Sequence, residues 1–307
     1  MEKIKIGLAG IGKIARDQHI PALAANRAFA LAATASRNAR VDGVEPHASV
    51  ADLVAARPDV AAISLCTPPD GRFSQAMAAI GAGRHLMLEK PPAATVSEAE
   101  ALVAAAQDAG VTLFATWHSR EAAEVDAARA WLANKRIDAI RIRWMEDIRQ
   151  WHPGQDWILD PGGFGVFDPG INALSIATAI LPDPLVVIRA TLAIPENRAC
   201  PIAATIAFRS GNAPVDAQFD FLQTGEQTWD IEVDTDAGTL RLRQGGARLE
   251  LPGTEPLSGP NREYSRLYRR FAELIGNGRS DVDLRPLRLV ADAFLVGQRK
   301  TVAPFDF

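Results

Sequence analysis

The chain has 307 residues, 48% of them hydrophobic, which is enough for two domains that each bury a core. Its 33 lysine and arginine residues against 37 aspartate and glutamate residues give a net charge of −4, which argues against a nucleic-acid-binding protein, since phosphate neutralisation needs a basic excess. No apolar stretch approaches the roughly 20 residues of a membrane-spanning helix, and the opening MEKIKIGLAG lacks a signal-peptide pattern. Cys66 and Cys200 lie outside any CxxC pattern. We therefore expect a cytoplasmic protein with no membrane segment, no nucleic-acid partner and no metal site.

Residues 1–120 alternate short apolar runs with alanine-rich helical segments. Apolar runs of strand length indicate strands that are buried on both faces of a parallel sheet. This rhythm predicts an α/β domain over residues 1–120, with a doubly wound parallel sheet of the Rossmann type. The predicted strands are Ile4–Ala9, Ala30–Ala35, Val60–Cys66, His85–Leu88 and Thr112–Ala115; the predicted helices include Phe73–Gly83 and Ser97–Gly110, the latter capped by Thr95 or Ser97.

The pattern changes after residue 120. Several segments alternate polar with apolar residues, which is typical of an antiparallel sheet with one face covered by helices. We predict a second, α+β domain over residues 121–307 with a mostly antiparallel open sheet, and a last helix, about residues 287–298, that packs back on the first domain. The predicted strands are Ile137–Met145, Leu185–Ile194, Ile202–Arg209, Val215–Phe221, Thr228–Asp234 and Thr239–Arg243, and the other helices lie near 122–134, 169–180 and 262–275.

A glycine-rich turn follows the first predicted strand. Gly10, Ile11, Gly12, Lys13, Ile14 and Ala15 form the pattern G-x-G-x-x-A. The first glycine turns the chain, the second lets the backbone approach a pyrophosphate, and the small sixth residue lets the helix pack closely on the sheet. Glycine turns between strand and helix are common, but this position in an alternating chain favours dinucleotide binding.

The second strand ends at Ser36 and Arg37, without the carboxylate that usually holds the ribose 2′-hydroxyl of NAD. A hydroxyl and a guanidinium suit a 2′-phosphate, because arginine forms charge-assisted hydrogen bonds with phosphate. We therefore predict NADP as the preferred cofactor, with NAD also used. The alternative is that Arg37 is a solvated turn residue.

Two further loops follow predicted strands, at the edge of the sheet where open α/β sheets bind ligands. One is Cys66-Thr67-Pro68-Pro69 and the other is Glu89-Lys90-Pro91-Pro92. Two prolines stiffen the loop after Lys90, and burial beside a cationic nicotinamide lowers the pKa of a lysine toward that of a useful base. Alone, these residues are equally consistent with a surface ion pair.

These three motifs, followed by Gly162-Gly163-Phe164-Gly165-Val166-Phe167-Asp168-Pro169-Gly170-Ile171-Asn172, resemble the glucose–fructose oxidoreductase/inositol dehydrogenase family. The resemblance covers essentially the whole chain, and it implies a cofactor-binding first domain and a second domain that presents its sheet and one long helix to substrate. Within the family, the strings GKIARDQH, ATWHSR, WHPGQDW and FDPGINALS are most similar to bacterial L-arabinose/D-galactose 1-dehydrogenases. That likeness implies oxidation of L-arabinose, or of D-galactose and D-fucose, at C1 to the aldonolactone.

The chain departs from the family pattern D-x-G-x-H at one position, where it has Asn172. Asparagine orients a hydroxyl through its amide but does not accept a proton near neutral pH. We therefore assign the base role to Lys90, assisted by Asp168, which lies four residues before Asn172 and so shares its helix face. An alternative is that Asp168 is a helix N-cap.

The resemblance also implies the remaining site residues. Trp229 is expected to form a wall of the sugar pocket, and His118 is expected near the nicotinamide. The predicted substrate-binding residues are His118, Glu146, Trp151, His152, Asp168, Asn172 and Trp229; the predicted cofactor-binding residues are Gly10, Ile11, Gly12, Lys13, Ile14, Ser36, Arg37, Cys66, Thr67, Pro68, Glu89, Lys90 and His118.

Two other functions fit the same residues. One is a catalytically silent sensor that binds sugar and dinucleotide, although a sensor does not need a proton acceptor such as Lys90. The other is a reductase of a small carbonyl or imine, which the tryptophan-, histidine- and asparagine-containing pocket disfavours. The sequence leaves the oligomeric state open, and a homo-oligomer is compatible with it.

Overall fold

The computed structural model describes residues 2–307, which divide into two compact units. Unit 1 consists of residues up to His118 together with Glu263–Leu284, and unit 2 consists of Ser119–Arg262 and Arg285–Phe307. Our predicted domains were two continuous segments, whereas in the structure residues 263–284 return to the first unit.

Unit 1 contains a six-stranded sheet in the order β3-β2-β1-β4-β5-β6, in which every pair of neighbours is parallel. This arrangement confirms the predicted doubly wound α/β class. Thr95 caps α4 by accepting a hydrogen bond from the backbone amide of Glu98, as one of our two predicted caps. The strands are β1 (Ile4–Ala9), β2 (Phe29–Ala35), β3 (Glu45–His47), β4 (Ala62–Leu65), β5 (His85–Leu88) and β6 (Leu113–Ala115), and the helices are α1 (Ile20–Ala24), α2 (Val50–Ala56), α3 (Arg72–Gly81), α4 (Val96–Asp108) and α8 (Glu263–Gly276).

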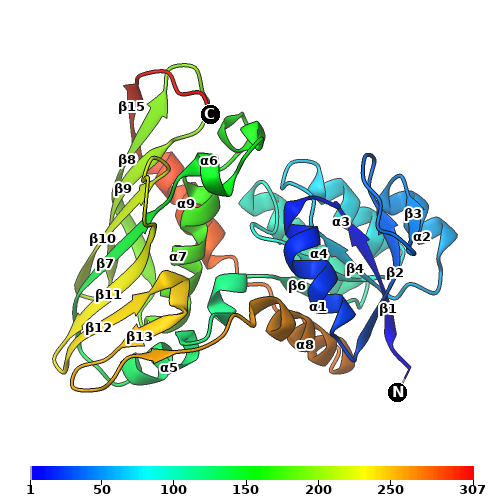
Figure 1. Cartoon of the computed structure of the whole chain (residues 1–307), viewed down its shortest axis with the longest axis horizontal. Coiled ribbons are helices and arrows are strands. Elements are labelled where there is room, and N and C mark those ends of the chain that lie inside the picture. Colours follow the sequence, from blue (N-terminus) through cyan, green and yellow to red (C-terminus); the bar gives the residue numbers. More distant parts are fainter. Residues whose placement is uncertain (1) are drawn as a thin grey trace. The chain divides into compact units, whose positions relative to one another are not determined.

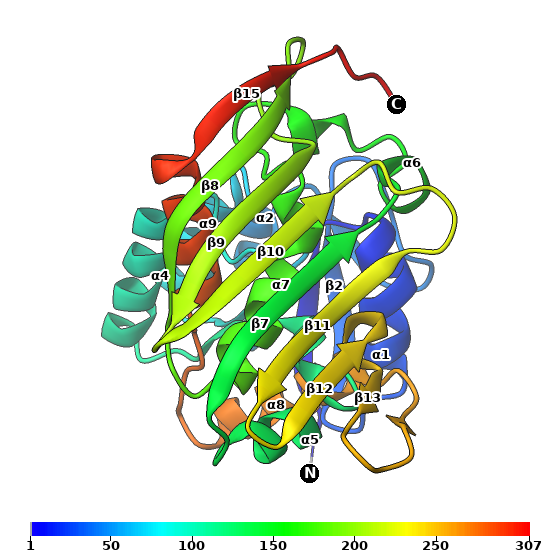
Figure 2. The same ribbon diagram turned by 90° about the vertical axis from the view of Figure 1, so that its left-hand side faces the viewer.

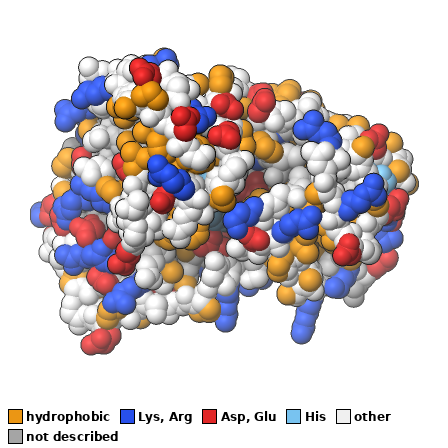
Figure 3. Space-filling model, turned by 45° about the horizontal axis from the view of Figure 1, so that its top comes forward, with side chains coloured by type: hydrophobic (Ala, Val, Ile, Leu, Met, Phe, Trp, Pro, Cys, Tyr) orange, Lys and Arg blue, Asp and Glu red, His pale blue; other side chains and the backbone are white. Residues whose placement is uncertain are grey.

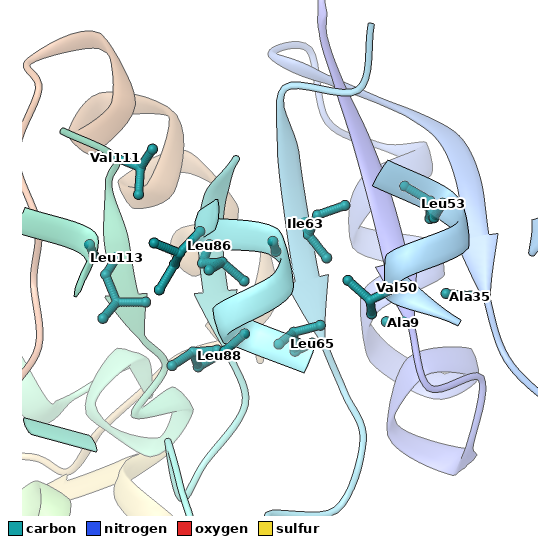
Figure 4. Packing of buried hydrophobic residues seen from close by; sticks show 14 of the residues in the cluster. Ala9, Ala35, Val50, Leu53, Ile63, Leu65, Leu86, Leu88, Val111 and Leu113 are labelled. Carbon is teal, nitrogen blue, oxygen red and sulfur yellow. The ribbon is translucent and has the colours of Figure 1, made fainter. Parts of the chain in front are cut away.

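Both faces of this sheet are covered. On one face, Ile63, Leu65, Leu86 and Leu88 of the strands pack with residues of α2, α3 and α4 in one buried cluster (Figure 4). On the other face, α8 buries five side chains against Phe29, Met87 and their neighbours. The five, which recur at helical spacing, are Tyr264, Leu267, Tyr268, Phe271 and Leu274. The second face of the parallel sheet is thus completed by a helix far along the chain.

Unit 2 is built on a nine-stranded sheet in the order β14-β13-β12-β11-β7-β10-β9-β8-β15. Two neighbouring pairs, β7 with β10 and β8 with β15, are parallel and the rest are antiparallel, which confirms the predicted mostly antiparallel sheet. Figures 1 and 2 show α5, α7 and α9 on the same side of this sheet. The strands are β7 (Ile137–Met145), β8 (Leu185–Pro195), β9 (Ala203–Ser210), β10 (Ala213–Asp220), β11 (Thr228–Thr235), β12 (Gly238–Arg243), β13 (Arg248–Glu250), β14 (Leu257–Ser258) and β15 (Gln298–Val302), and the helices are α5 (Val125–Leu132), α6 (Ile148–Trp151), α7 (Phe167–Ile180) and α9 (Arg285–Val296).

The last helix differs from our prediction. It ends at Val296, where β15 begins two residues later, and it belongs to unit 2, where it packs against α7 and β8. The reason is its apolar face: Leu289, Val290 and Ala293 are buried, and the ring of Phe294 contacts that of Phe167 on α7. The helix that completes unit 1 is α8, the one before it.

The surface carries mixed charge. On the face in Figure 3, lysine and arginine side chains are interspersed with aspartate and glutamate side chains. No helix within residues 2–307 has the length and apolar character needed to cross a bilayer.

Candidate active site

The loop after β1 has the geometry of a dinucleotide-binding turn. Gly10 has a φ of +83°, and a Cβ there would lie 2.7 Å from the amide nitrogen of Thr67, so a side chain is excluded by both conformation and space. A Cβ on Gly12 would instead meet nothing within 4 Å, which leaves its backbone open to a ligand. Ala15 is fully buried where the following helical turn packs on the sheet. The cradle therefore fits a pyrophosphate.

Ser36 and Arg37, which follow β2, line a cavity of about 360 Å³. None of its lining residues is acidic, and both Arg37 and Arg40 contribute to its wall. Hydroxyl and guanidinium donors of this kind suit an anionic group. The full lining is Ser36, Arg37, Asn38, Ala39, Arg40, Pro46, His47 and Ala48.

The predicted catalytic loop follows β5. Glu89 is buried, and its Oε2 accepts a hydrogen bond from the backbone amide of Lys90 at 2.9 Å. The peptide bond between Lys90 and Pro91 is cis. Since β1, β2, β4, β5 and β6 are parallel, the loops that carry all the predicted cofactor residues emerge from the same edge of this sheet.

Glu89 is the centre of a buried polar cluster. Its Oε1 lies 2.9 Å from His19 Nε2 and accepts a hydrogen bond from the hydroxyl of Tyr264 at 2.8 Å. His19 Nδ1 lies 2.8 Å from the hydroxyl of Tyr268. Tyr264 and Tyr268 come from α8, so this helix is connected by hydrogen bonds to the buried cluster at the end of β5.

His19 and Glu89, which form the charged pair of this cluster, shift each other's pKa. Burial by itself raises the pKa of Glu89, but the hydrogen bond and charge of His19 outweigh it and lower that pKa to about 2. Burial likewise opposes protonation of His19, yet the neighbouring Cys66, Tyr268 and Glu89 groups hold the pKa of the imidazole well above its usual range. A protonated His19 donates from both ring nitrogens, to Glu89 and to Tyr268.

His118 follows β6 and is also fixed by α8. Its Nδ1 lies 2.7 Å from Glu263 Oε2, and its ring stacks on Tyr264 with centroids 5.8 Å apart. The first two residues of α8 therefore orient the imidazole that we predict to lie near the nicotinamide.

In unit 2, Glu146 joins several of the predicted sugar-binding residues. It directly follows β7 and is 4% exposed. Its Oε1 lies 2.9 Å from His152 Nε2, and its Oε2 accepts a hydrogen bond from Trp229 Nε1 at 3.0 Å. The antiparallel register of β11 with β7 places Trp229 opposite Trp144, two residues before Glu146. Sheet pairing therefore brings Trp229 to this carboxylate.

The aromatic members form one wall. The ring of Trp151 meets that of Trp229 edge to face, with centroids 5.1 Å apart, and remains 39% exposed. A half-exposed indole beside hydrogen-bonding groups can pack against the C–H face of a sugar ring. His152 Nδ1 extends the cluster to Asp168 Oδ2 at 3.9 Å.

Asp168 and Asn172 lie one turn apart near the start of α7. The N-cap of this helix is Val166, so Asp168 is inside the first turn and the N-cap alternative is wrong. Asn172 Oδ1 is buried and has no hydrogen-bond partner. An unsatisfied buried amide oxygen is costly unless a ligand donates to it, and a sugar hydroxyl is such a donor.

Four residues that contact predicted site residues were not assigned to the site from sequence: His19, Glu263, Tyr264 and Arg72, whose guanidinium donates to the backbone carbonyls of Thr67 and Glu89. The helical spacing of Tyr264 and Tyr268 predicted an amphipathic helix but carried no information about which sheet it covers. Arg72 is the first residue of α3, one position before our predicted helix start at Phe73. Within residues 2–307 there is no cluster of three or more His, Cys, Asp or Glu side chains arranged to hold a metal ion.

Comparisons with known proteins cover both units. The sequence model of a family described as "Oxidoreductase family, NAD-binding Rossmann fold" matches residues 4–117. The chain is 45% identical to galactose 1-dehydrogenase from Pseudomonas fluorescens over 99% of each sequence. It superposes on the crystal structure of a D-galactose-1-dehydrogenase protein from Rhizobium etli with a TM-score of 0.96 and 52% identity, over 100% of this chain and 99% of that chain. The 3-ketoreductase KijD10 from Actinomadura kijaniata shares the fold, with a TM-score of 0.85 at 21% identity over 99% of this chain and 100% of that chain.

Proposed function

The chain belongs to the glucose–fructose oxidoreductase/inositol dehydrogenase family of NAD(P)-dependent oxidoreductases, and we propose that it is an aldose 1-dehydrogenase. The substrates are aldoses of galactose configuration: D-galactose, D-fucose and L-arabinose. The supporting observation is the cluster of Glu146, His152, Trp229 and Asp168, beside the unsatisfied amide oxygen of Asn172. The names of the two full-length relatives favour D-galactose, whereas the sequence alone led us to put L-arabinose first.

In this proposal the turn at Gly10 and Gly12 would hold the dinucleotide, whose nicotinamide would supply the acceptor for the hydride from C1 of the pyranose. Lys90 accepts the proton of the C1 hydroxyl while C1 gives up the hydride, so that the sugar loses two electrons and two protons and becomes the aldonolactone. Asp168 assists Lys90. His152 and Asn172 bind ring hydroxyls, while Trp151 and Trp229 pack against the apolar face of the ring.

We further propose NADP as the preferred cofactor, with NAD as a weaker substitute. The support is the cavity beside Ser36 and Arg37, which has two arginines and no acidic residue in its lining. A 2′-phosphate forms charge-assisted hydrogen bonds with such groups, whereas NAD brings only a hydroxyl to the same place.

The test is the absorbance of reduced nicotinamide with NADP⁺ and NAD⁺ in turn, against D-galactose, D-fucose, L-arabinose, D-glucose, D-xylose and myo-inositol. We expect turnover with the three galactose-configured sugars and a higher kcat/KM with NADP⁺. Cofactor binding without turnover of any of these sugars would overturn the proposal of a dehydrogenase and would favour a sensor.

The assignment of Lys90 is tested with Lys90→Ala. We expect kcat to fall by about 100-fold or more, since general-base catalysis contributes on that scale, while the Kd for NADP⁺ changes little. Lys5→Ala, in β1 and paired with Asp59 on the surface, is the matched control and is expected to keep wild-type turnover. Equal losses of turnover and cofactor affinity in Lys90→Ala would instead mark Lys90 as structural.

A further inference from the structure

Arg72, which no part of the proposed chemistry uses, is a buried guanidinium beside the loop that carries Lys90. It is the first residue of α3, it is 2% exposed, and it ranks among the largest fully buried side chains in the protein. Burying a guanidinium is costly unless most of its five N–H groups find acceptors. The groups that accept its hydrogen bonds therefore indicate the structural role of Arg72.

The acceptors include three backbone carbonyls on two loops. Nη1 donates to the carbonyl oxygens of both Glu89 and Pro91, the residues on either side of Lys90. Nε donates to the carbonyl oxygen of Thr67 at 3.0 Å, and Nη2 donates to the same oxygen. One rigid, planar group thus connects the loop after β4 with the loop after β5.

The backbone around Lys90 is consequently held at three points. The guanidinium fixes the carbonyl before it and the carbonyl after it, and Glu89 Oε2 accepts the amide of Lys90 itself. The loop after β4 is restrained as well, since Thr67 Oγ1 donates to Gln75 on α3 at 3.1 Å. Hydrogen bonds from a charged donor are stronger than neutral ones, and a fork-shaped donor also fixes direction.

We propose that Arg72 is a positioning residue for proton transfer: its guanidinium holds the backbone on both sides of Lys90 in register with the Thr67 loop. This inference rests on the proposed function, in which Lys90 accepts the proton and Thr67 belongs to the cofactor-binding loop. Misplacement of a catalytic group by about 1 Å can cost about 100-fold in rate, so loss of the guanidinium acts mainly on kcat. Lysine does not replace it, because a single ammonium cannot span both loops in a fixed plane.

The test uses Arg72→Ala and Arg72→Lys in the full-length protein, with Arg84→Ala as the matched control. Arg84 immediately precedes β5, at the end opposite the catalytic loop. We expect kcat to fall about 100-fold in Arg72→Ala and substantially in Arg72→Lys, with the KM for sugar changed less than about threefold. Millimolar guanidinium, below denaturing concentrations, is expected to restore part of kcat in Arg72→Ala but not in Lys90→Ala.

The readouts separate positioning from stability and from the proposed function. Turnover of folded Arg72 variants within threefold of wild type, or a loss of kcat that guanidinium leaves unchanged at a constant Tm, would overturn the positioning role. If Arg72→Ala does not fold, the same comparison is made with Arg72→Lys, where near-wild-type kcat overturns it. Full turnover of Lys90→Ala would overturn both proposals, whereas loss in Lys90→Ala with retention in Arg72→Ala would overturn this one alone.

Discussion

Glu146 is a buried carboxylate that joins two side chains of the proposed sugar site. Each of its oxygens is already engaged, one with His152 and the other with Trp229. From sequence we assigned Glu146 to direct contact with sugar hydroxyls. In the structure these oxygens contact the imidazole of His152 and the indole of Trp229. We therefore expect Glu146 to orient these two side chains and not to contact the sugar itself.

Glu146→Gln tests this role, because an amide offers one acceptor where two donors must be satisfied. We expect the KM for sugar to rise about tenfold, the scale expected for one buried donor left unpaired, while the Kd for NADP⁺ stays at the wild-type value. Trp229→Phe removes only the N–H and keeps an aromatic ring, and should raise KM less. Steady-state kinetics and cofactor titration supply both numbers; a parallel loss of cofactor affinity in Glu146→Gln would show that the effect is not local to the sugar side.

At the scale of elements, the hydrophobic pattern predicted most of the helices and strands but few of the polar contacts between them. β1, β5 and β7 have the predicted bounds, because the apolar runs of β1 and β5 end at Gly10 and Glu89 and the alternation of β7 ends at Glu146. The short strands β3, β13, β14 and β15 were missed, since two to five residues are too few to show a period. Partners that depend on tertiary packing, such as His19 with Glu89, have no signal in local spacing.

The contacts of α8 with unit 1 likewise could not be predicted from local spacing. They lead to a prediction about the pH dependence of stability. It docks through Tyr268 and Tyr264 onto the buried pair of His19 and Glu89. Glu89 has a folded pKa of about 2, below its ordinary 4.5, so its stabilisation is present above pH 4.5 and is lost as the pH falls through about 2. His19 has a folded pKa well above 6.5, so its stabilisation is complete below pH 6.5 and is lost as the pH rises through the folded value.

The pair should therefore stabilise the protein most between pH 4.5 and 6.5. We expect the free energy of unfolding of the wild type to exceed that of His19→Gln by the largest margin in this window, and the margin to shrink toward alkaline pH. Urea unfolding of both proteins across the pH range gives the comparison. A margin that does not change with pH would mean that His19 and Glu89 form a neutral hydrogen bond and not an ion pair.

For the whole molecule, the main consequence of the fold is that unit 1 is assembled from two distant segments of the chain. The second segment contributes α8, whose side chains Tyr264, Leu267, Tyr268, Phe271 and Leu274 cover one face of the parallel sheet. Burying a large apolar side chain stabilises by about 1.5–3 kcal/mol, comparable in sum to the stability of an entire domain. The first segment alone therefore leaves an apolar sheet face exposed.

This organisation predicts how fragments behave. A fragment of residues 1–118 should be aggregated or unfolded, because it lacks the helix that covers Phe29, Met87 and Phe114. Joining residues 1–118 to 263–284 through a short glycine–serine linker should yield a folded domain, since the side chains of His118 and Glu263 already lie 2.7 Å apart at the junction. Because the cofactor residues predicted from sequence all lie within this domain, we expect it to bind NADP⁺ with an affinity near that of the full chain and to lack sugar oxidation.

Circular dichroism measures whether each fragment is folded, light scattering measures aggregation, and cofactor titration measures the affinity for NADP⁺. A soluble, cooperatively folded 1–118 fragment would show that α8 is dispensable for unit 1, and a folded fusion that fails to bind NADP⁺ would show that unit 2 contributes to the cofactor site.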